Sequence, residues 1–147
     1  MADDAYQVSL RLARLLAARP NTAVTSIFRN PDHTSEIQET GAKPLVLSLE
    51  DASVSQLADA FKSAKADVVY FSAGAGGKGG SDRTKKVDEE GAIKVFDAIE
   101  SLGGSVEERP RLILVSAIDT RDTSKGYPSY YVSILRSNTS PLGIAYT

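Results

Sequence analysis

The sequence predicts an α/β protein with the doubly wound layout, in which a parallel sheet carries helices on both faces. Segments with helical apolar spacing alternate along the chain with short β-branched or apolar segments, in the order αβαβαβαβ. Two strand-like segments, 67–72 and 111–116, are near-continuous apolar runs, as in strands that are covered on both faces. With 147 residues, the chain is expected to form a single domain over 1–147 that ends in an irregular tail over 120–147.

A helix over 5–18 and a strand over 23–28 open the chain. The helix ends at Arg19-Pro20-Asn21, and the strand is β-branched and aromatic with turn residues on both sides. Apolar residues recur in the helix at i, i+4, i+7 and i+8, which forms one apolar face: Val8, Leu12, Leu15 and Leu16.

A short helix and a second strand follow. Thr34 or Ser35 caps the short helix, and Gly41 is well placed to end it in the left-handed conformation. Pro44 then opens a short strand over 45–47.

Two further helices flank the apolar run 67–72. Ser53 caps the first of them, and the second covers 82–102 and is closed by Gly103-Gly104. Between the run and the second helix lies a glycine-dense loop over 73–80. The apolar faces of the two helices consist of Val54, Leu57, Ala58 and Phe61, and of Ala92, Val95, Phe96, Ile99 and Leu102.

Composition excludes several classes of function. The chain has no cysteine and one histidine, His33, so thiolate nucleophiles, iron–sulfur clusters and cysteine- or histidine-rich metal sites are excluded, and no metal is expected. A net charge of −2 argues against a nucleic-acid protein driven by bulk charge. No apolar run is long enough for a membrane span, and the first residues lack the pattern of a signal peptide. We therefore expect a cytoplasmic protein without membrane or nucleic-acid partners.

The segment from Gly74 to Gly79 spells G-x-G-x-x-G after a strand and before a helix, as in a dinucleotide fingerprint. The acid that the fingerprint needs about 20 residues later falls on Asp97 or Glu100, inside the predicted helix. A P-loop is also excluded, because Gly80 stands where its lysine belongs. Two interpretations remain open: a flexible loop, or a loop whose glycines let a ligand approach the backbone at the carboxyl edge of the sheet.

Basic residues near that edge are candidates for an anion site. Arg29 follows strand 23–28 directly, so its guanidinium can bind a ribose 2′-phosphate, although a lone arginine there is more often solvated. The charge run 82–90 is interpreted as the solvent-exposed face of a helix start. Alternatively, the lysines in or beside it face a phosphate: Lys78, Lys85 and Lys86.

A cluster of tyrosines, Tyr127, Tyr130 and Tyr131, follows Ser116. A tyrosine hydroxyl near a nicotinamide can donate a proton if a neighbouring cation lowers its pKa. No lysine follows any of these tyrosines at four residues, since Leu135 stands four after Tyr131. The predicted acid thus lacks the lysine that would lower its pKa.

Five sequence segments, taken in their order along the chain, resemble the atypical short-chain dehydrogenase/reductase family, specifically its NAD(P)-binding, NmrA-like branch. The resemblance covers about residues 8–131. The five segments are Val24-Thr-Ser-Ile-Phe-Arg-Asn-Pro, Gly41-Ala-Lys-Pro-Leu-Val, Ala66-Asp-Val-Val-Tyr-Phe-Ser-Ala-Gly-Ala-Gly-Gly-Lys-Gly-Gly, Val87-Asp88 with Gly91, and Leu114-Val-Ser-Ala-Ile. The resemblance implies a Rossmann-like fold in which this chain, truncated at both ends, lacks the first strand and its Gly-rich turn. That strand would lie between strands 23–28 and 68–73, so another segment, a partner chain or a second copy in a homodimer is expected to cover the exposed sheet edge.

The same resemblance assigns roles to residues of this chain. It implies that Arg29 binds the 2′-phosphate of NADP(H), that Ser48 and Leu49 lie near the adenine, and that three small residues lie along the ribose and nicotinamide side. Those three are Ala73, Gly74 and Ala75. Ser116 takes the place of the catalytic serine, and Tyr130 or Tyr131 that of the catalytic tyrosine.

These observations predict an NADP(H)-dependent oxidoreductase-like protein that reduces a small carbonyl or enone. In that function the tyrosine protonates the developing alkoxide and Ser116 hydrogen-bonds it. Two alternatives remain open: a non-catalytic NADP(H)-sensing or partner-binding module of the NmrA type, and an inactive truncated fragment.

Overall fold

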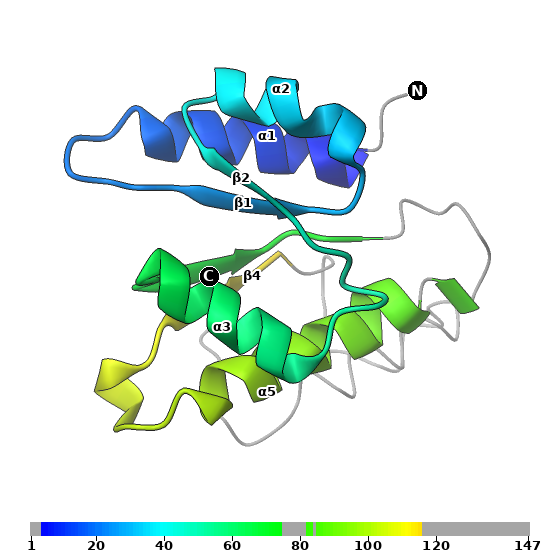
Figure 1. Cartoon of the computed structure of the whole chain (residues 1–147), viewed down its shortest axis with the longest axis vertical. Coiled ribbons are helices and arrows are strands. Elements are labelled where there is room, and N and C mark those ends of the chain that lie inside the picture. Colours follow the sequence, from blue (N-terminus) through cyan, green and yellow to red (C-terminus); the bar gives the residue numbers. More distant parts are fainter. Residues whose placement is uncertain (1–3, 75–81, 84, 116–147) are drawn as a thin grey trace, which may run out of the picture. The chain divides into compact units, whose positions relative to one another are not determined.

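The computed structural model describes residues 4–74, 82–83 and 85–115. Contacts divide the chain into two compact units, an N-terminal unit, Met1–Ala52, and a C-terminal unit, Ser53–Thr147. Each unit contains one pair of parallel strands together with helices (Figure 1). The predicted α/β class with parallel strands is therefore confirmed.

The N-terminal unit follows the predicted order of elements. Its strands pair in parallel, with Thr25 opposite Lys43 and Phe28 opposite Val46. In Figure 1 both of its α-helices lie on the same side of this strand pair. The elements are α1 (Asp4–Ala17), β1 (Thr25–Phe28), a 3₁₀ turn η1 (Pro31–His33), α2 (Thr34–Glu39) and β2 (Lys43–Val46).

Turns in this unit use the left-handed backbone conformation. Asn21 has φ 57° and Gly41 has φ 87°, and the Gly41 amide donates to the Gln38 carbonyl at 2.9 Å. A Cβ atom at Gly41 would stand 3.2 Å from the Cβ of Ala17. Gly41 thus ends α2 as predicted, and it also leaves room for the end of α1.

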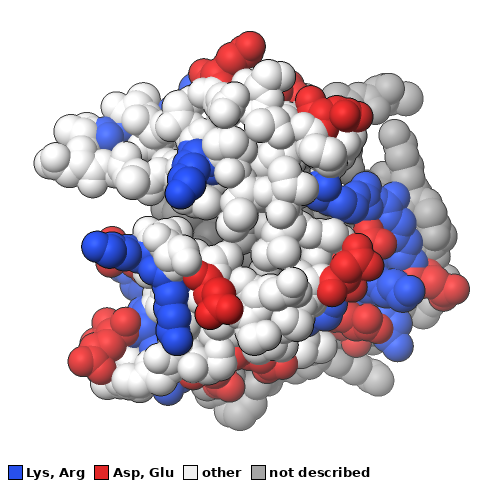
Figure 2. Space-filling model, in the orientation of Figure 1, with Lys and Arg blue, Asp and Glu red and all other residues white. Residues whose placement is uncertain are grey.

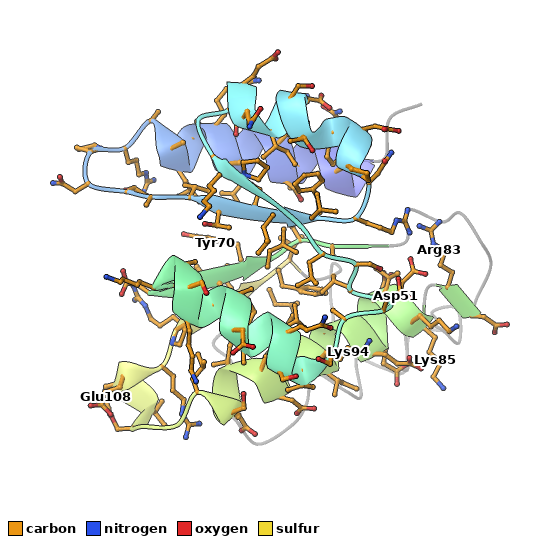
Figure 3. The ribbon with its side chains drawn as sticks, viewed as in Figure 1. Asp51, Tyr70, Arg83, Lys85, Lys94 and Glu108 are labelled. Atoms are coloured by element: carbon orange, nitrogen blue, oxygen red, sulfur yellow. The ribbon has the colours of Figure 1, made fainter. Side chains whose placement is uncertain are left out.

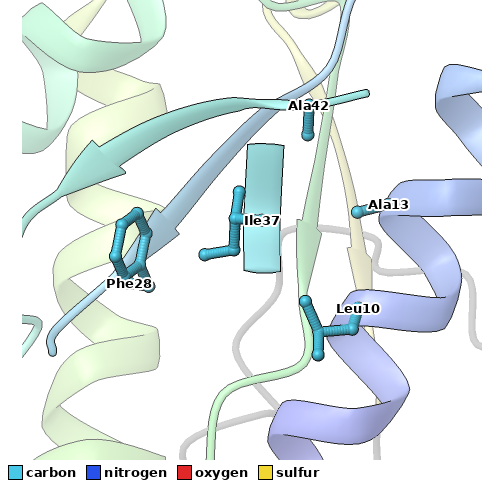
Figure 4. Packing of buried hydrophobic residues seen from close by; sticks show 5 residues of the cluster. All are labelled: Leu10, Ala13, Phe28, Ile37 and Ala42. Atoms are coloured by element: carbon cyan, nitrogen blue, oxygen red, sulfur yellow. The ribbon is translucent and has the colours of Figure 1, made fainter. Parts of the chain in front are cut away.

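A small apolar cluster holds the N-terminal unit together. Figure 4 shows its buried members side by side, and Tyr6 and Val24 pack against them. The cluster joins residues of both helices, of β1 and of the turn before β2: Leu10, Ala13, Phe28, Ile37 and Ala42.

The C-terminal unit pairs two strands that are far apart in sequence. Val68 lies opposite Arg111, and Phe71 lies opposite Leu114, in parallel register. The elements are α3 (Val54–Ala64), β3 (Val68–Phe71), a π-helical segment η2 (Lys85–Glu90), α5 (Gly91–Ser101), a 3₁₀ turn η3 (Val106–Glu108) and β4 (Arg111–Leu114). Within the predicted helix 82–102, residues 82–83 and Gly91–Ser101 are α-helical, whereas Lys85–Glu90 is wound more widely as a π-helix.

Packing of α3 against α5 forms the core of this unit. Ser53 caps α3 through a capping box with Gln56, whose backbone N–H donates to the Ser53 hydroxyl at 3.2 Å. Lys65 ends the helix with φ 49°. The side chains between the helices are buried, and Leu57 and Ala98 are 0% exposed. Most of the predicted apolar residues of both helices therefore lie in the core, while Val54, Phe96 and Leu102 are partly buried at its margin.

The two sides of the β3–β4 pair differ in exposure. Phe71 is buried, whereas its neighbour Tyr70 is 39% exposed and lies opposite Ile113, which is 43% exposed. Figure 3 shows the Tyr70 side chain on the side of β3 away from α3. Since successive residues of a strand point to opposite faces, α3 and α5 cover one face of this pair.

Strand pairing among the described residues forms two separate two-stranded sheets, β1–β2 and β3–β4. No third strand pairs with either of them in that part of the chain. The predictions that a second copy or a partner chain covers a sheet edge, and that residues 1–147 form one domain, stay predictions.

Candidate functional site

The carboxyl ends of β1 and β2 meet at one edge of the N-terminal unit. Arg29 follows Phe28 directly, and the Leu47 amide donates to the Phe28 carbonyl at 2.9 Å, which extends the strand pairing by one residue. Arg29 and the turn that begins at Ser48 therefore leave the strand pair at the same edge. The sequence assigned these two residues to cofactor binding, and the structure brings their backbones together.

Arg29 forms an ion pair that the sequence did not reveal. Its Nη1 lies 2.6 Å from the Glu50 Oε1, with the Arg29 side chain 54% exposed and the Glu50 side chain 26% exposed. The Ala52 amide donates to the Ser48 carbonyl at 2.8 Å, which closes the turn that carries Glu50. A pair of this exposure contributes up to about 1 kcal/mol to stability. Its larger effect is to place a carboxylate beside the guanidinium that was predicted to bind phosphate.

The Ser48 hydroxyl is buried and has no hydrogen-bond partner. A hydroxyl can donate one hydrogen bond and accept two, and a buried polar group without a partner costs about 1–3 kcal/mol. Ser48 thus offers an unused hydroxyl at the carboxyl edge of β2. Leu49, which the resemblance placed near adenine together with Ser48, is partly buried next to it.

In the C-terminal unit the candidate residues follow β3. Ala73 is exposed and Gly74 is partly buried, two and three residues after the end of the strand. The Val115 amide donates to the Phe71 carbonyl at 2.9 Å, so the chain after β4 leaves from the same edge. Ala75, Ser116, Tyr130 and Tyr131 lie outside the described residues, as does Lys78. Their predicted roles stay predictions.

Basic residues after the glycine-rich segment point to solvent. Lys85 and Lys86, both exposed, begin η2, and Figure 3 labels Lys85 at this start and Lys94 further along, in α5. In Figure 2 the Lys and Arg side chains on the visible face are interspersed with Asp and Glu. Of the two interpretations of Lys85 and Lys86, their exposure therefore favours the solvent-exposed face of a helix. One Glu89 carboxylate oxygen in the same segment is buried without a hydrogen-bond partner.

Tyr6, His33 and Glu36 form a polar cluster between α1 and α2. The Tyr6 hydroxyl donates to Glu36 Oε2 at 2.7 Å, and His33 Nδ1 lies 3.4 Å from the same oxygen. The rings of Tyr6 and His33 stand 4.3 Å apart. Burial, followed by the hydrogen bond and the charge of Glu36, raises the pKa of Tyr6 well above its usual range. Tyr6 thus holds its proton, and it is an anchor for α1 rather than an acid.

A polar groove of about 230 Å³ lies at the opposite, amino ends of β3 and β4. Asp67, Glu108, Arg109 and Arg111 contribute to its lining. Arg109 donates from Nη2 to the Gly104 carbonyl at 3.2 Å, while its Nε is buried without a partner. Ligands of open parallel sheets bind beyond the carboxyl ends of the strands, so this groove does not belong to the predicted site.

The described residues hold neither a cluster of metal-binding side chains nor a helix that could cross a membrane. Across residues 4–74, 82–83 and 85–115, no three His, Cys, Asp or Glu side chains gather as a metal site would require. None of the helices in this part of the chain has the length and apolar character needed to cross a membrane.

Comparison with known proteins gives a family match and three relatives. The model of a family described as NAD(P)H-binding matches residues 7–139. A UPF0659 protein of Schizosaccharomyces pombe is 41% identical over 118 residues, which cover 80% of this chain and 46% of that protein. A UPF0659 protein of Saccharomyces cerevisiae is 38% identical over 114 residues, covering 74% and 47%.

A Bacillus subtilis protein named as an uncharacterized sugar epimerase is 29% identical over 130 residues, which cover 86% of this chain and 57% of that protein. The chain spans about half the length of the curated relatives it matches. No solved structure matches it significantly.

Proposed function

The chain belongs to the NAD(P)H-binding family, and we propose that it binds NADP(H) at the carboxyl ends of its parallel strands. We further propose a cytoplasmic oxidoreductase of the short-chain dehydrogenase/reductase type, in its NmrA-like branch, that reduces a small carbonyl or enone. A nicotinamide cofactor is what the family binds. The preference for NADP(H), the reaction and the substrate class are the proposal.

One observation carries the proposal: an exposed guanidinium and a buried hydroxyl without a partner stand at the same sheet edge. Arg29 has more than half of its side chain in solvent, where it can bind a ribose 2′-phosphate by charge-assisted hydrogen bonds. Ser48 lacks any hydrogen-bond partner for its buried hydroxyl, which an adenosine group would supply. These side chains fit the adenosine end of NADP(H).

Small residues after β3 suit the other end of the cofactor. Ala73, Gly74 and Ala75 carry little or no side chain. The ribose and nicotinamide side of the cofactor can therefore approach the backbone closely at these residues. When bound, a nicotinamide cofactor supplies hydride transfer.

Acid and hydrogen-bonding residues complete the proposed reaction. Tyr130 or Tyr131 would donate a proton to the substrate oxygen, and Ser116 would hold that oxygen by a hydrogen bond. A sugar is the second substrate class to test, because the Bacillus subtilis relative is named as a sugar epimerase.

Calorimetric titration with NADPH, and separately with NADH, tests the binding site. We expect micromolar NADPH affinity and at least about tenfold weaker NADH binding, a difference of about 1.4 kcal/mol. Arg29→Ala should remove that preference, whereas Arg19→Ala, which deletes an exposed arginine of the same unit, should leave it unchanged. No heat with either cofactor in the unsubstituted chain would overturn the proposal.

NADPH oxidation with a panel of small carbonyls, enones and oxidised sugars tests the reaction. Tyr130→Phe or Tyr131→Phe should abolish turnover while leaving the NADPH affinity unchanged. If the cofactor raises the melting temperature and no compound of the panel is turned over, the enzyme proposal is wrong and the non-catalytic NmrA-like sensor is the function that remains.

A further inference from the structure

The ion pair between Arg29 and Glu50 stands where the proposed function needs a phosphate to bind. The Nη1–Oε1 distance of 2.6 Å is that of a short charge-assisted hydrogen bond. Glu50 is the more enclosed partner, with 26% of its side chain exposed against 54% for Arg29. Any anion that approaches this guanidinium therefore also meets a carboxylate.

Backbone hydrogen bonds fix the position from which Glu50 reaches Arg29. Leu47 is tied to Phe28 by its amide at 2.9 Å, and the turn from Ser48 to Ala52 is closed at 2.8 Å. The segment that carries Glu50 is thus held to β1 at its start, and its turn is closed by a hydrogen bond between its own two ends. The fold thus fixes the main chain that carries Glu50 at this edge, and from there its carboxylate pairs with Arg29.

The charges of this pair act oppositely on the two nicotinamide cofactors. A 2′-phosphate carries up to two negative charges, so it is attracted by Arg29 and repelled by Glu50. It must also compete with Glu50 for the same guanidinium donors. An unphosphorylated ribose brings neutral hydroxyls instead, which can donate to the carboxylate. Glu50 therefore favours the unphosphorylated cofactor, and Arg29 favours the phosphorylated one.

From this geometry we infer that Glu50 is a specificity-determining residue that limits the preference for NADP(H) over NAD(H). In this role Glu50 accepts hydrogen bonds from the adenosine ribose of NAD(H) and competes with the 2′-phosphate of NADP(H) for Arg29. The inference rests on the proposed function, since it assumes that the adenosine ribose lies at this edge. It concerns the ratio of the two affinities and not whether a cofactor binds.

Ser48 supplies an internal reference for that ratio. Its buried hydroxyl without a partner is neutral, so it does not distinguish a phosphate from a hydroxyl by charge. Ser48→Ala should therefore weaken NADP(H) and NAD(H) by similar factors, whereas a change at Glu50 should move them in opposite directions.

Titrations of Glu50→Gln with both cofactors test the inference. This isosteric change keeps the side-chain shape and removes the charge, so NADPH should bind more tightly and NADH more weakly. We expect the affinity ratio to rise about tenfold, which corresponds to about 1.4 kcal/mol. The rise should shrink at high salt, because the interaction with the phosphate is ionic. In an Arg29→Ala background it should also be smaller, because no guanidinium remains for which the carboxylate and the phosphate compete.

Asp51→Asn is the matched control. Asp51 is the exposed neighbour of Glu50, and its substitution removes the same charge from the same turn without touching the Arg29 pair. The affinity ratio of this variant should stay within about twofold of the original, since its charge acts through solvent.

Two failures of this experiment are distinguishable. If the unsubstituted chain binds both cofactors and the ratios of Glu50→Gln and Asp51→Asn are equal, the inference is wrong and the proposed function stands. If the unsubstituted chain binds neither cofactor, the proposed function is wrong and the inference is overturned with it. Far-ultraviolet circular dichroism of each variant confirms that the fold is kept.

Discussion

The two units of the molecule share a plan, one parallel strand pair with helices, but different interactions hold them together. In the C-terminal unit the helices α3 and α5 meet over apolar side chains, of which Leu57 and Ala98 are fully buried. In the N-terminal unit the apolar cluster is smaller, and polar contacts add to it: Tyr6 with Glu36, and Arg29 with Glu50.

This difference separates stability from selectivity. Polar side chains at the carboxyl edge of β1–β2 can change their hydrogen bonds when a ligand arrives, because one side of each contact faces solvent. Apolar side chains between α3 and α5 cannot be exchanged for ligand contacts without leaving a cavity. We therefore expect substitutions in the C-terminal unit to act mainly on stability, and those at the edge of the N-terminal unit mainly on cofactor preference.

Leu57→Ala should have the largest effect on stability. Leu57 is 0% exposed, and loss of a fully buried leucine side chain costs about 3–5 kcal/mol, including the cavity that remains. Leu15→Ala in α1 is the control, because Leu15 is 68% exposed and its loss should cost less than about 0.5 kcal/mol. Urea unfolding measures both values, and similar losses would show that the α3–α5 core is not the main source of stability.

Gly41→Ala should be the second largest and brings a matched pair from the two units. Gly41 and Gly103 both have positive φ, at 87° and 72°, and an alanine there costs roughly 1–2 kcal/mol of backbone strain. A Cβ at Gly41 also meets Ala17 at 3.2 Å, whereas one at Gly103 meets no atom within 4 Å. Thermal unfolding should therefore show a larger loss for Gly41→Ala than for Gly103→Ala, and the reverse order would contradict this account of the α1–α2 contact.

Ser53→Ala should lower the free energy of unfolding by about 1 kcal/mol, because it removes the hydroxyl of the α3 capping box. Asn30→Ala is the corresponding change in the N-terminal unit, where Asn30 caps the three-residue turn η1 through its side chain. This loss should be smaller, since fewer residues depend on the cap. Equal losses in chemical denaturation would mean that cap energies do not follow the length of the helix they begin.

Tyr6→Phe should have the smallest effect at neutral pH, about 1 kcal/mol or less for a partly exposed hydrogen bond. The folded state raises the pKa of Tyr6, so above the unfolded pKa of about 10 it holds a proton that the unfolded chain releases. Stability from this group is therefore complete below about pH 10 and falls as the pH rises beyond it.

A pH series of urea unfolding, compared with Tyr6→Phe, measures this contribution of Tyr6. Tyr70→Phe in β3 is the control that removes a tyrosine hydroxyl from the other unit. An identical alkaline decline in the unsubstituted chain and in Tyr6→Phe would show that Tyr6 is not the titrating group.

The fold was predictable wherever local patterns decide the outcome. The predicted helix 5–18 and the cap at Ser53 match the bounds of α1 and the start of α3 closely, and Gly41 and Gly103 have the positive φ expected of helix ends. The predicted apolar face of α1 was wrong, because Val8 and Leu15 are 48% and 68% exposed. Leu10 and Ala13 are the residues of α1 that pack into the apolar cluster. Strand bounds were less accurate: the segments 23–28 and 67–72 are strands only over Thr25–Phe28 and Val68–Phe71, whereas the predicted strand 45–47 is observed as Lys43–Val46. Pairing with a neighbour, and not composition, decides where a strand begins. The wide winding of 85–90 also escaped prediction, because Val87 is the one apolar residue of this segment and a single residue has no period that could distinguish a π-helix from an α-helix.

Half of the candidate site was predictable for a geometric reason. Arg29 and Ser48 follow two neighbouring strands, and parallel strands end at a common edge. Glu50 was missed because its partner stands 21 residues earlier in the chain. The signal was nevertheless present in the sequence. Glu50 lies in the turn after β2, and β2 pairs with β1, the strand that Arg29 follows. The roles of the reaction residues, Tyr130 or Tyr131 as proton donor and Ser116 as hydrogen-bonding group, came from resemblance and stay predictions.

The pairing registers also imply an order of assembly during synthesis. Partners in β1–β2 stand roughly 18 positions apart and those in β3–β4 roughly 43, so closing the second loop costs about 0.8 kcal/mol more entropy. The shorter closure is also the first to leave the ribosome. We therefore expect a nascent chain stalled after β2 to acquire protease resistance in β1–β2 well before β4 has been translated.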